Sequence, residues 1–139
     1  ISVSEETAAL ISFALDMAEK TKSALDPTIY PVLAAWGFTT DSKQVPSQEQ
    51  IDALLERVDY SKIQLDGTTL TMPKGMQLDL GAVGKGYTAD SVAEVLQTHG
   101  VQSALINLGG NIQAVGSRPD GSDWRIGIRA PWGKTTWAC

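Results

Sequence analysis

Hydrophobic residues recur at helical spacing over residues 4–23, and this pattern predicts an amphipathic helix. Ser4 is placed to cap the first turn, because its hydroxyl can accept a hydrogen bond from an unpaired helical N–H group. The predicted apolar face consists of Ile11, Ala14, Leu15 and Ala18.

A second helix of this kind is predicted after Ser47, which has the spacing of a capping box with Gln50. Its apolar face consists of Ile51, Leu54, Leu55 and Val58. The two helices are separated by a segment rich in turn residues.

That intervening segment, residues 25–38, contains its own helix-start signal. Asp26 followed by Pro27 has the form of a capping residue and a first-turn proline. We expect a short helix that is shortened or kinked at Pro31 and ended by Gly37.

Short β signals follow the second predicted helix. Residues 62–65 and 68–72 flank Asp66-Gly67, which predicts a hairpin with a tight turn. Residues 76–80 alternate apolar and polar side chains and predict a third strand.

The C-terminal part of the chain combines one helix with further strands. Thr88–Thr98 is predicted to be helical and to stop at Gly100. The residues predicted to face inward are Val92, Val95 and Leu96. Further strands are predicted at residues 103–108, 111–115 and 124–128, the first two joined by Gly109-Gly110.

The order of these elements, helices first and then strands with one helix among them, favours an α+β fold. We expect helices packed on a mostly antiparallel sheet, in one domain of 139 residues. No predicted element after residue 128 covers the edge of the last strand, and the chain begins with Ile1 rather than Met. We therefore expect an incomplete fragment of a larger domain.

Charge limits the partners of the chain. Eleven basic and sixteen acidic residues give a net charge of −5, and the basic residues are scattered. A nucleic acid or an anionic membrane surface is therefore not the expected partner. No apolar run is long enough to span a bilayer.

The inventory of reactive side chains is small. Cys139 is the only cysteine and His99 the only histidine, so an internal disulfide, a zinc site and a Ser-His-Asp triad are excluded. His99 is interpreted as a favourable charge near a helix C-terminus. A bound metal would be a hard cation held by oxygen atoms.

The stretch LDLGAVGKGYTAD, residues 78–90, is the candidate for a phosphate site. Its spacing is too short for a Walker A loop, and the dinucleotide fingerprint that starts at Gly84 lacks its later acidic residue. Two interpretations remain: an anion site at a helix N-terminus, or glycines that form a strand-to-helix turn with positive φ. Lys85 favours the anion, because the helix dipole alone would repel its charge.

Two aspartates next to these signals have alternative roles. On residue type alone, Asp26 is better explained as a helix cap than as a ligand contact. Asp79 would face away from the apolar side of strand 76–80, at the glycine bend. It would be either solvated or available to an adenine or a ribose.

Three segments together resemble the FAD:protein FMN transferases of the ApbE family, long labelled thiamine-biosynthesis lipoproteins. They are ALDPTIYPVLAAWGF (24–38), LDLGAVGKGYTADSVAEVL (78–96) and ALINLGGNIQAVGSRPDGSDWRIGI (104–128). The likeness runs from about Ser4 to Pro131 in the family's order. It implies an enzyme that uses Mg²⁺ to move FMN from FAD onto a threonine hydroxyl of an acceptor flavoprotein, with release of AMP.

The resemblance also implies roles for particular residues. The positions that match FAD contacts of the family are Ala24, Leu25, Asp26, Asp79 and Lys85. Ala82 matches a metal ligand, which an alanine can provide only through its carbonyl oxygen. Gly109, Gly110 and Asn111 match a turn beside the site.

Parts of the family pattern are missing from the chain. The early strands are absent, as is a C-terminal segment with an Asp, a Thr and a histidine motif, so the catalytic residues are unknown. We expect the 139-residue chain itself to bind FAD poorly and to catalyse little. The alternatives are an FAD pyrophosphatase that yields FMN and AMP, or a non-catalytic flavin carrier or interaction module. By resemblance, the full-length protein is exported and lipid-anchored on the periplasmic side of the cytoplasmic membrane, although some relatives look cytoplasmic.

Overall fold

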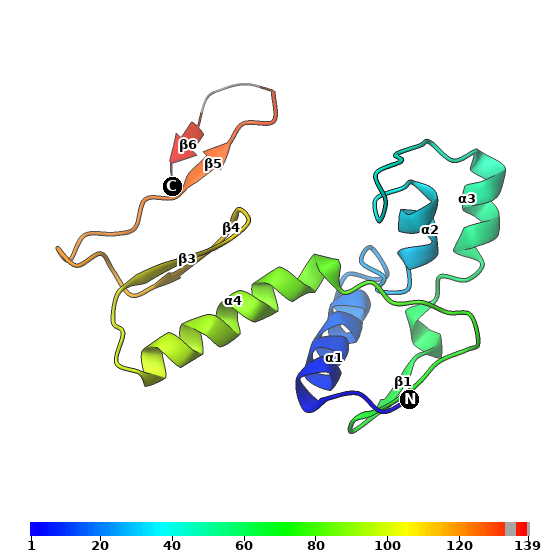
Figure 1. Cartoon of the computed structure of the whole chain (residues 1–139), viewed down its shortest axis with the longest axis horizontal. Coiled ribbons are helices and arrows are strands. Elements are labelled where there is room, and N and C mark those ends of the chain that lie inside the picture. Colours follow the sequence, from blue (N-terminus) through cyan, green and yellow to red (C-terminus); the bar gives the residue numbers. More distant parts are fainter. Residues whose placement is uncertain (133–135, 139) are drawn as a thin grey trace. The chain divides into compact units, whose positions relative to one another are not determined.

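Helices and antiparallel strand pairs make up the computed structural model, which describes residues 1–132 and 136–138 (Figure 1). The chain divides into two compact units, Ile1–Gly84 and Lys85–Cys139. The elements in the first unit are α1 (Glu5–Lys20), α2 (Tyr30–Ala35), α3 (Gln48–Leu55), the 3-10 turn η1 (Tyr60–Lys62), β1 (Gln64–Asp66) and β2 (Thr69–Thr71). Helix α4 (Gly81–Thr98) begins at the end of this unit, and the second unit adds β3 (Ala104–Leu108), β4 (Asn111–Val115), β5 (Gly127–Arg129) and β6 (Thr136–Ala138).

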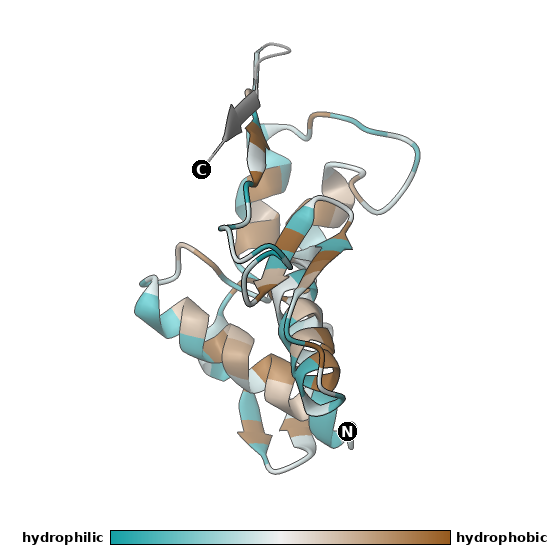
Figure 2. Ribbon diagram, turned by 90° about the vertical axis from the view of Figure 1, so that its left-hand side faces the viewer, coloured by the Kyte–Doolittle hydropathy of each residue, from teal (hydrophilic) through white to brown (hydrophobic). Residues whose placement is uncertain are grey.

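The core of the first unit forms where α1 meets the β1–β2 hairpin. Ile11 of α1 packs with Ile63, Leu70 and Met76, all buried. The Ser4 side chain accepts a hydrogen bond from the Thr7 N–H, so the predicted cap is confirmed. Hydrophobic and hydrophilic residues are interleaved along the helices, as amphipathic packing requires (Figure 2).

The predicted hairpin is confirmed, and the N-terminus extends it. Asp66 pairs with Thr69, and Gly67 takes a positive φ of 55° in the turn. The Leu70 N–H donates to the Ile1 carbonyl at 2.8 Å, which adds the first residues of the chain to the outer side of β2.

Helix α2 is shorter than expected and has a different cap. It begins at Tyr30, and the residue at its N-cap is Ile29, which makes no side-chain capping bond. The interpretation of Asp26 as a helix cap is therefore wrong, because its carboxylate forms other bonds, described below. Gly37 has φ of 73° at the end of the helix, as the stop signal predicted.

Helix α3 carries the predicted capping box. The Ser47 side chain accepts from the Gln50 N–H, and the Gln50 side chain accepts from the Ser47 N–H. Helices α2 and α3 contact each other. No residue of α3 is fully buried, so its apolar face remains available to line a cavity.

The prediction of a strand at residues 76–80 is wrong. This segment has no strand pairing, although Met76 is buried and Leu78 and Leu80 pack against the same core. The Asp79 N–H donates to the Pro27 carbonyl at 2.7 Å. Alternating hydrophobicity reports which side chains are buried, and here the burial occurs without a hydrogen-bonded ladder.

Helix α4 differs most from expectation, because it begins at Gly81 rather than Thr88. The glycine-rich stretch is thus helical, and none of Gly81, Gly84 and Gly86 has a positive φ. The turn interpretation of these glycines is therefore wrong.

The buried face of α4 also differs from the prediction. Val92 and Val95 are 37% and 57% exposed, whereas Ala89 and Ala93 are buried. Ala93 packs against Ile106 and Val115 of the β3–β4 hairpin, and Leu96 packs at this contact as expected.

The second unit has its core between α4 and the β3–β4 hairpin. Ala93, Ile106 and Val115 are its buried residues. The register pairs Ala104 with Val115 and Leu108 with Asn111. Both predicted strands are confirmed, and Gly109 and Gly110 take positive φ values of 62° and 97° in the turn.

The last predicted strand begins three residues later than expected and ends one residue later, at Gly127–Arg129. The expectation of an uncovered edge is also wrong, because β6 pairs with β5 in antiparallel register. Cys139 lies outside the described residues.

The α+β class and the antiparallel pairing are confirmed. The strands form three separate two-stranded ribbons rather than one sheet. Among residues 1–132 and 136–138, no helix has the length and hydropathy needed to cross a membrane.

The helical conformation of the glycines in α4 can be tested by a stability measurement. At Gly86 an added Cβ would have nothing within 4 Å. We expect Gly86→Ala to raise the free energy of unfolding by about 0.5–1 kcal/mol, because alanine has less chain entropy to lose. Urea-induced unfolding measures this change.

Gly116 is the matched control. Its φ is 56°, and a Cβ there would lie 2.1 Å from the Gln102 carbonyl oxygen. Gly116→Ala should therefore destabilise the protein. A stability loss in Gly86→Ala would contradict the helical assignment of the glycine stretch.

Candidate functional site

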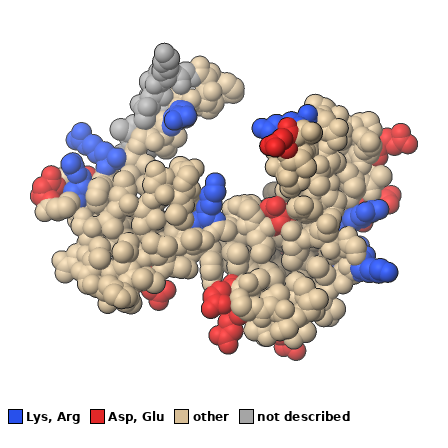
Figure 3. All heavy atoms as spheres, viewed as in Figure 1, with Lys and Arg blue, Asp and Glu red and all other residues tan. Residues whose placement is uncertain are grey.

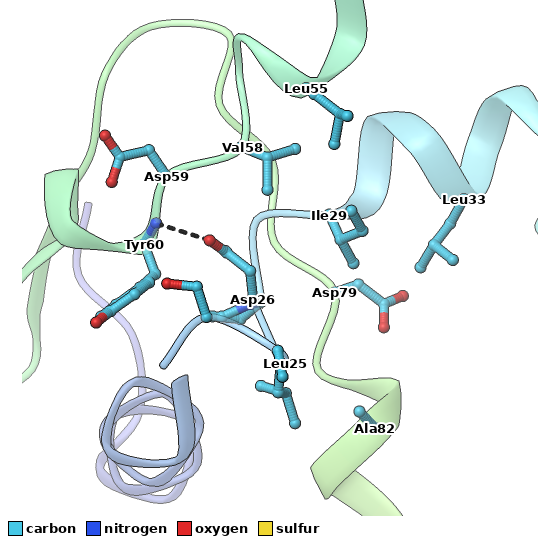
Figure 4. A pocket seen from close by; sticks show the side chains of 13 residues that line it. Leu25, Asp26, Ile29, Leu33, Leu55, Val58, Asp59, Tyr60, Asp79 and Ala82 are labelled. Atoms are coloured by element: carbon cyan, nitrogen blue, oxygen red, sulfur yellow. Dashed lines mark hydrogen bonds between the residues drawn. The ribbon is translucent and has the colours of Figure 1, made fainter. Parts of the chain in front are cut away.

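A cavity of about 740 Å³ lies within the first unit. It is bordered by the segment after α1, the start of α2, the end of α3, the approach to η1 and the start of α4 (Figure 4). Five of the six residues predicted to contact FAD or metal line it: Ala24, Leu25, Asp26, Asp79 and Ala82. Residues distant in sequence thus meet at one site.

The end of α1 directs the chain into this cavity. Lys22 and Ser23 take positive φ values of 53° and 65°, a conformation that is uncommon for residues other than glycine. The Ser23 N–H donates to the Ala18 carbonyl, and the Leu25 N–H donates to the Thr21 hydroxyl. This left-handed turn presents residues 24–26 to the cavity.

The Asp26 carboxylate accepts three hydrogen bonds from the protein. Its Oδ1 accepts from the Thr28 N–H at 2.8 Å and the Thr28 hydroxyl at 2.6 Å. Its Oδ2 accepts from the Tyr60 N–H at 3.2 Å, the bond drawn in Figure 4. Asp26 therefore joins two segments of the cavity wall.

Thr28 is completely buried and completes the same network. Its hydroxyl donates to Asp26 and accepts from the Asp59 N–H at 2.8 Å. Thr28 was not among the residues predicted from the sequence. The signal was present, since Asp-x-Thr is the pattern of an Asx turn.

Asp79 reaches the cavity from a third segment. Its N–H donates to the Pro27 carbonyl, and its Oδ1 accepts from the Gly81 N–H at 2.9 Å. Asp79 therefore satisfies one unpaired N–H at the start of α4. Ala82 follows in the first turn of that helix and borders the cavity next to Asp79 (Figure 4).

One side of the cavity is apolar. It is formed by side chains from α2, α3 and their flanks: Ile29, Leu33, Leu55 and Val58 (Figure 4). Leu55 is 44% exposed. An accessible apolar surface next to polar groups is typical of a small-molecule site.

Three aspartates are also among the lining residues, and the carboxylate of one of them, Asp59, is ion-paired with Lys62 at 3.1 Å. These aspartates are Asp26, Asp59 and Asp79, and the lining includes no Lys or Arg. The Ser61 hydroxyl, and after it the Lys62 ammonium, lower the pKa of the Asp59 carboxyl. Carboxylates accept hydrogen bonds from ligand N–H and O–H groups and repel phosphate. The cavity therefore suits a nucleoside or an aromatic ring better than a diphosphate.

The described residues provide oxygen ligands of the predicted kind, but too few of these ligands for a complete metal site. The Asp79 carboxylate and the Ala82 carbonyl are oxygen ligands of the type that Mg²⁺ binds. Within residues 1–132 and 136–138, no group of three His, Cys, Asp or Glu residues could hold a metal ion. These residues alone do not complete a magnesium site.

Lys85, the sixth predicted residue, begins the second unit. A Cβ added to Gly109 would lie 3.9 Å from its Nζ, so the lysine extends to the β3–β4 turn. Asn107 Oδ1 accepts from the Gly110 N–H in that turn. Lys85 forms no ion pair with the described part of the chain.

The β3–β4 turn borders a second cavity of about 750 Å³, contained in the second unit. Gly109 and Gly110, which match the family turn, line it together with Asn107 and Arg129. Elsewhere, basic side chains occur singly or in small groups over the visible face (Figure 3).

The ApbE family model matches residues 1–138. The FAD:protein FMN transferase of Treponema pallidum is 35% identical, over 90% of this chain and 39% of that protein. The crystal structure of an ApbE protein from Thermotoga maritima has a TM-score of 0.90 and 31% identity, covering 98% of this chain and 46% of that one. The apo flavinyl transferase ApbE of Pseudomonas stutzeri has a TM-score of 0.86 and 32% identity, covering 99% of this chain and 44% of that one.

The chain therefore belongs to the ApbE family. It spans less than half the length of the curated relatives and solved structures described above.

The Asp26 network makes a stability prediction. Asp26→Ala should lower the free energy of unfolding by about 2–3 kcal/mol, because the Tyr60 N–H and the Thr28 hydroxyl both lose their acceptor. Chemical denaturation measures the loss.

Asp120 provides a matched control, since it also accepts an N–H and a hydroxyl bond, from Ser122, but on an exposed loop. Asp120→Ala should barely move the unfolding midpoint. Equal losses at the two positions would contradict the role of Asp26 in joining cavity segments.

Proposed function

We propose that the complete protein carrying this chain is an FAD:protein FMN transferase, which transfers FMN from FAD to a threonine hydroxyl of an acceptor flavoprotein and releases AMP. The observation that carries the proposal is the meeting of Ala24, Leu25, Asp26, Asp79 and Ala82 at one cavity. The similarity to the FAD:protein FMN transferase of Treponema pallidum and to the flavinyl transferase ApbE of Pseudomonas stutzeri supports the same activity.

In this proposal the cavity of the first unit binds an uncharged part of FAD. The apolar side next to Ile29 and Leu33 suits an aromatic ring. The Asp79 carboxylate has an oxygen left to accept from an N–H or O–H group of the ligand, because only Oδ1 bonds to the Gly81 N–H. Apolar stacking and one directed acceptor would fix the orientation of the substrate.

Lys85 is proposed to neutralise the diphosphate. Its ammonium has no ion-pair partner among the described residues. It is carried near the start of α4, where the helix dipole also favours an anion. The helical glycines beside it present no side chains that would keep a phosphate away.

A magnesium ion is proposed to bind the Ala82 carbonyl and further oxygen ligands outside the described residues. When bound, it would supply charge stabilisation to the pyrophosphate during transfer. The residues of this chain would bind and orient FAD so that the FMN phosphorus is accessible to the acceptor hydroxyl.

Export and a lipid anchor on the full-length protein also remain proposals. Their support is the resemblance to a family of lipoproteins. The acceptor flavoprotein belongs to the same proposal.

The test uses the complete protein with FAD, Mg²⁺ and a threonine-bearing acceptor. We expect AMP release together with covalent flavin on the acceptor, seen as in-gel fluorescence and by mass spectrometry. EDTA should abolish both signals, and excess Mg²⁺ should restore them. Lys85→Ala and Asp79→Ala should each lower kcat/KM by roughly tenfold or more, because each removes a charged contact to FAD.

Lys74→Ala is the control, since Lys74 lies outside the lining of the first-unit cavity, and turnover should be unchanged. AMP formation without any acceptor would instead assign an FAD pyrophosphatase. FAD binding without cleavage would assign a carrier.

A further inference from the structure

We infer that Thr28 is a positioning residue for FAD binding: its buried hydroxyl holds the Asp59–Tyr60 backbone in place as one wall of the cavity. This inference rests on the proposed function, because FAD is the ligand whose affinity it would set. Thr28 contributes no surface to the cavity, so any effect on the ligand must be transmitted through the residues that it holds.

The turn at residues 26–28 bonds to both other polar segments of the cavity wall. The Thr28 hydroxyl accepts from the Asp59 N–H at 2.8 Å, and Asp26 accepts from the next N–H, that of Tyr60. On its other side, the Pro27 carbonyl accepts from the Asp79 N–H at 2.7 Å. One short turn thus fixes two segments that lie 31 to 34 and about 50 residues away.

The hydroxyl is closed off from solvent. Thr28 has no exposed surface, and its hydroxyl both donates and accepts. Removing it would leave the Asp59 N–H without an acceptor and would remove one of the two Thr28 donors from Asp26. The wall would then move to find other partners, and the cavity would lose its fit to a ligand.

The same network limits how Asp26 can contact FAD. Because its two oxygens already accept three protein hydrogen bonds, its main task is to hold this wall. A contact of residues 24–26 with FAD would then come mainly from the main chain and from Leu25.

The experiment compares Thr28→Val, which keeps the shape without the hydroxyl, with Thr28→Ser, which keeps the hydroxyl. In the complete protein, FAD affinity is measured by flavin fluorescence titration below the melting temperature of every variant. We expect Kd to rise by roughly tenfold or more in Thr28→Val. It should stay within about twofold of the original value in Thr28→Ser.

Hydrogen exchange gives a readout that does not need turnover. The Asp59 and Tyr60 amides should exchange faster in Thr28→Val than in Thr28→Ser. In the unsubstituted protein, saturating FAD should slow both amides, so this measurement applies even if Thr28→Val does not fold.

Leu70→Ala separates positioning from general stability. Leu70 is 3% exposed in the core beneath α1 and does not line the cavity. We expect it to lower Tm at least as much as Thr28→Val while leaving the Kd for FAD unchanged.

The outcomes distinguish the two proposals. A complete protein that does not bind FAD would refute the proposed function, and Asp59 exchange would then test the structural role of Thr28 alone. Normal FAD affinity in Thr28→Val would overturn the inference while leaving the function intact. The inference would also be overturned if Leu70→Ala weakened FAD binding equally, or if FAD left the two amides unchanged.

Discussion

The buried turn at residues 26–28 is the constraint on which the cavity depends. Asp26, Pro27 and Thr28 each contribute one acceptor to a distant N–H group, those of Tyr60, Asp79 and Asp59 respectively. Thr28 itself has no exposed surface, and a buried polar group without a partner is costly. The turn therefore has few alternative conformations. The side chains of the segments that bond to it are held in defined positions as a result.

The chemistry of the cavity follows from what this turn brings together. It unites an apolar side from α2 and α3 with three aspartates, of which Asp59 is paired with Lys62, and no Lys or Arg is among the lining residues. Such a lining suits the neutral rings of a dinucleotide and not its phosphates. In the proposed transferase, positive charge must come from elsewhere, and Lys85 with a divalent cation would supply it. In this proposal, Lys85 is the one residue of the family set that carries a positive charge because it contacts the diphosphate.

Helix α4 contains the glycine-rich motif and also carries Lys85, the proposed source of positive charge. The motif is part of the helix from Gly81 onward, so its glycines give helical backbone without side chains, at a cost in helix propensity. The loss of helix propensity is explained if a phosphate must approach the helix closely. Membership of the ApbE family, with relatives more than twice as long as this chain, agrees with a site whose remaining ligands lie outside the described residues.

Local patterns of the sequence were sufficient for α1, α3 and the two central hairpins, because capping residues and tight-turn glycines act within a few residues of themselves. The resemblance to the ApbE family also selected the residues that meet at the cavity. Local patterns failed at residues 76–80 and at Val92 and Val95, where burial depends on partners distant in sequence. They also assigned Asp26 to a helix that begins at Tyr30. The sequence by itself determined α1, α3, the two central hairpins and, through the family resemblance, the candidate residues. Only the tertiary structure decided that Asp26 and Thr28 hold the cavity wall, because their hydrogen-bond partners lie more than thirty residues away.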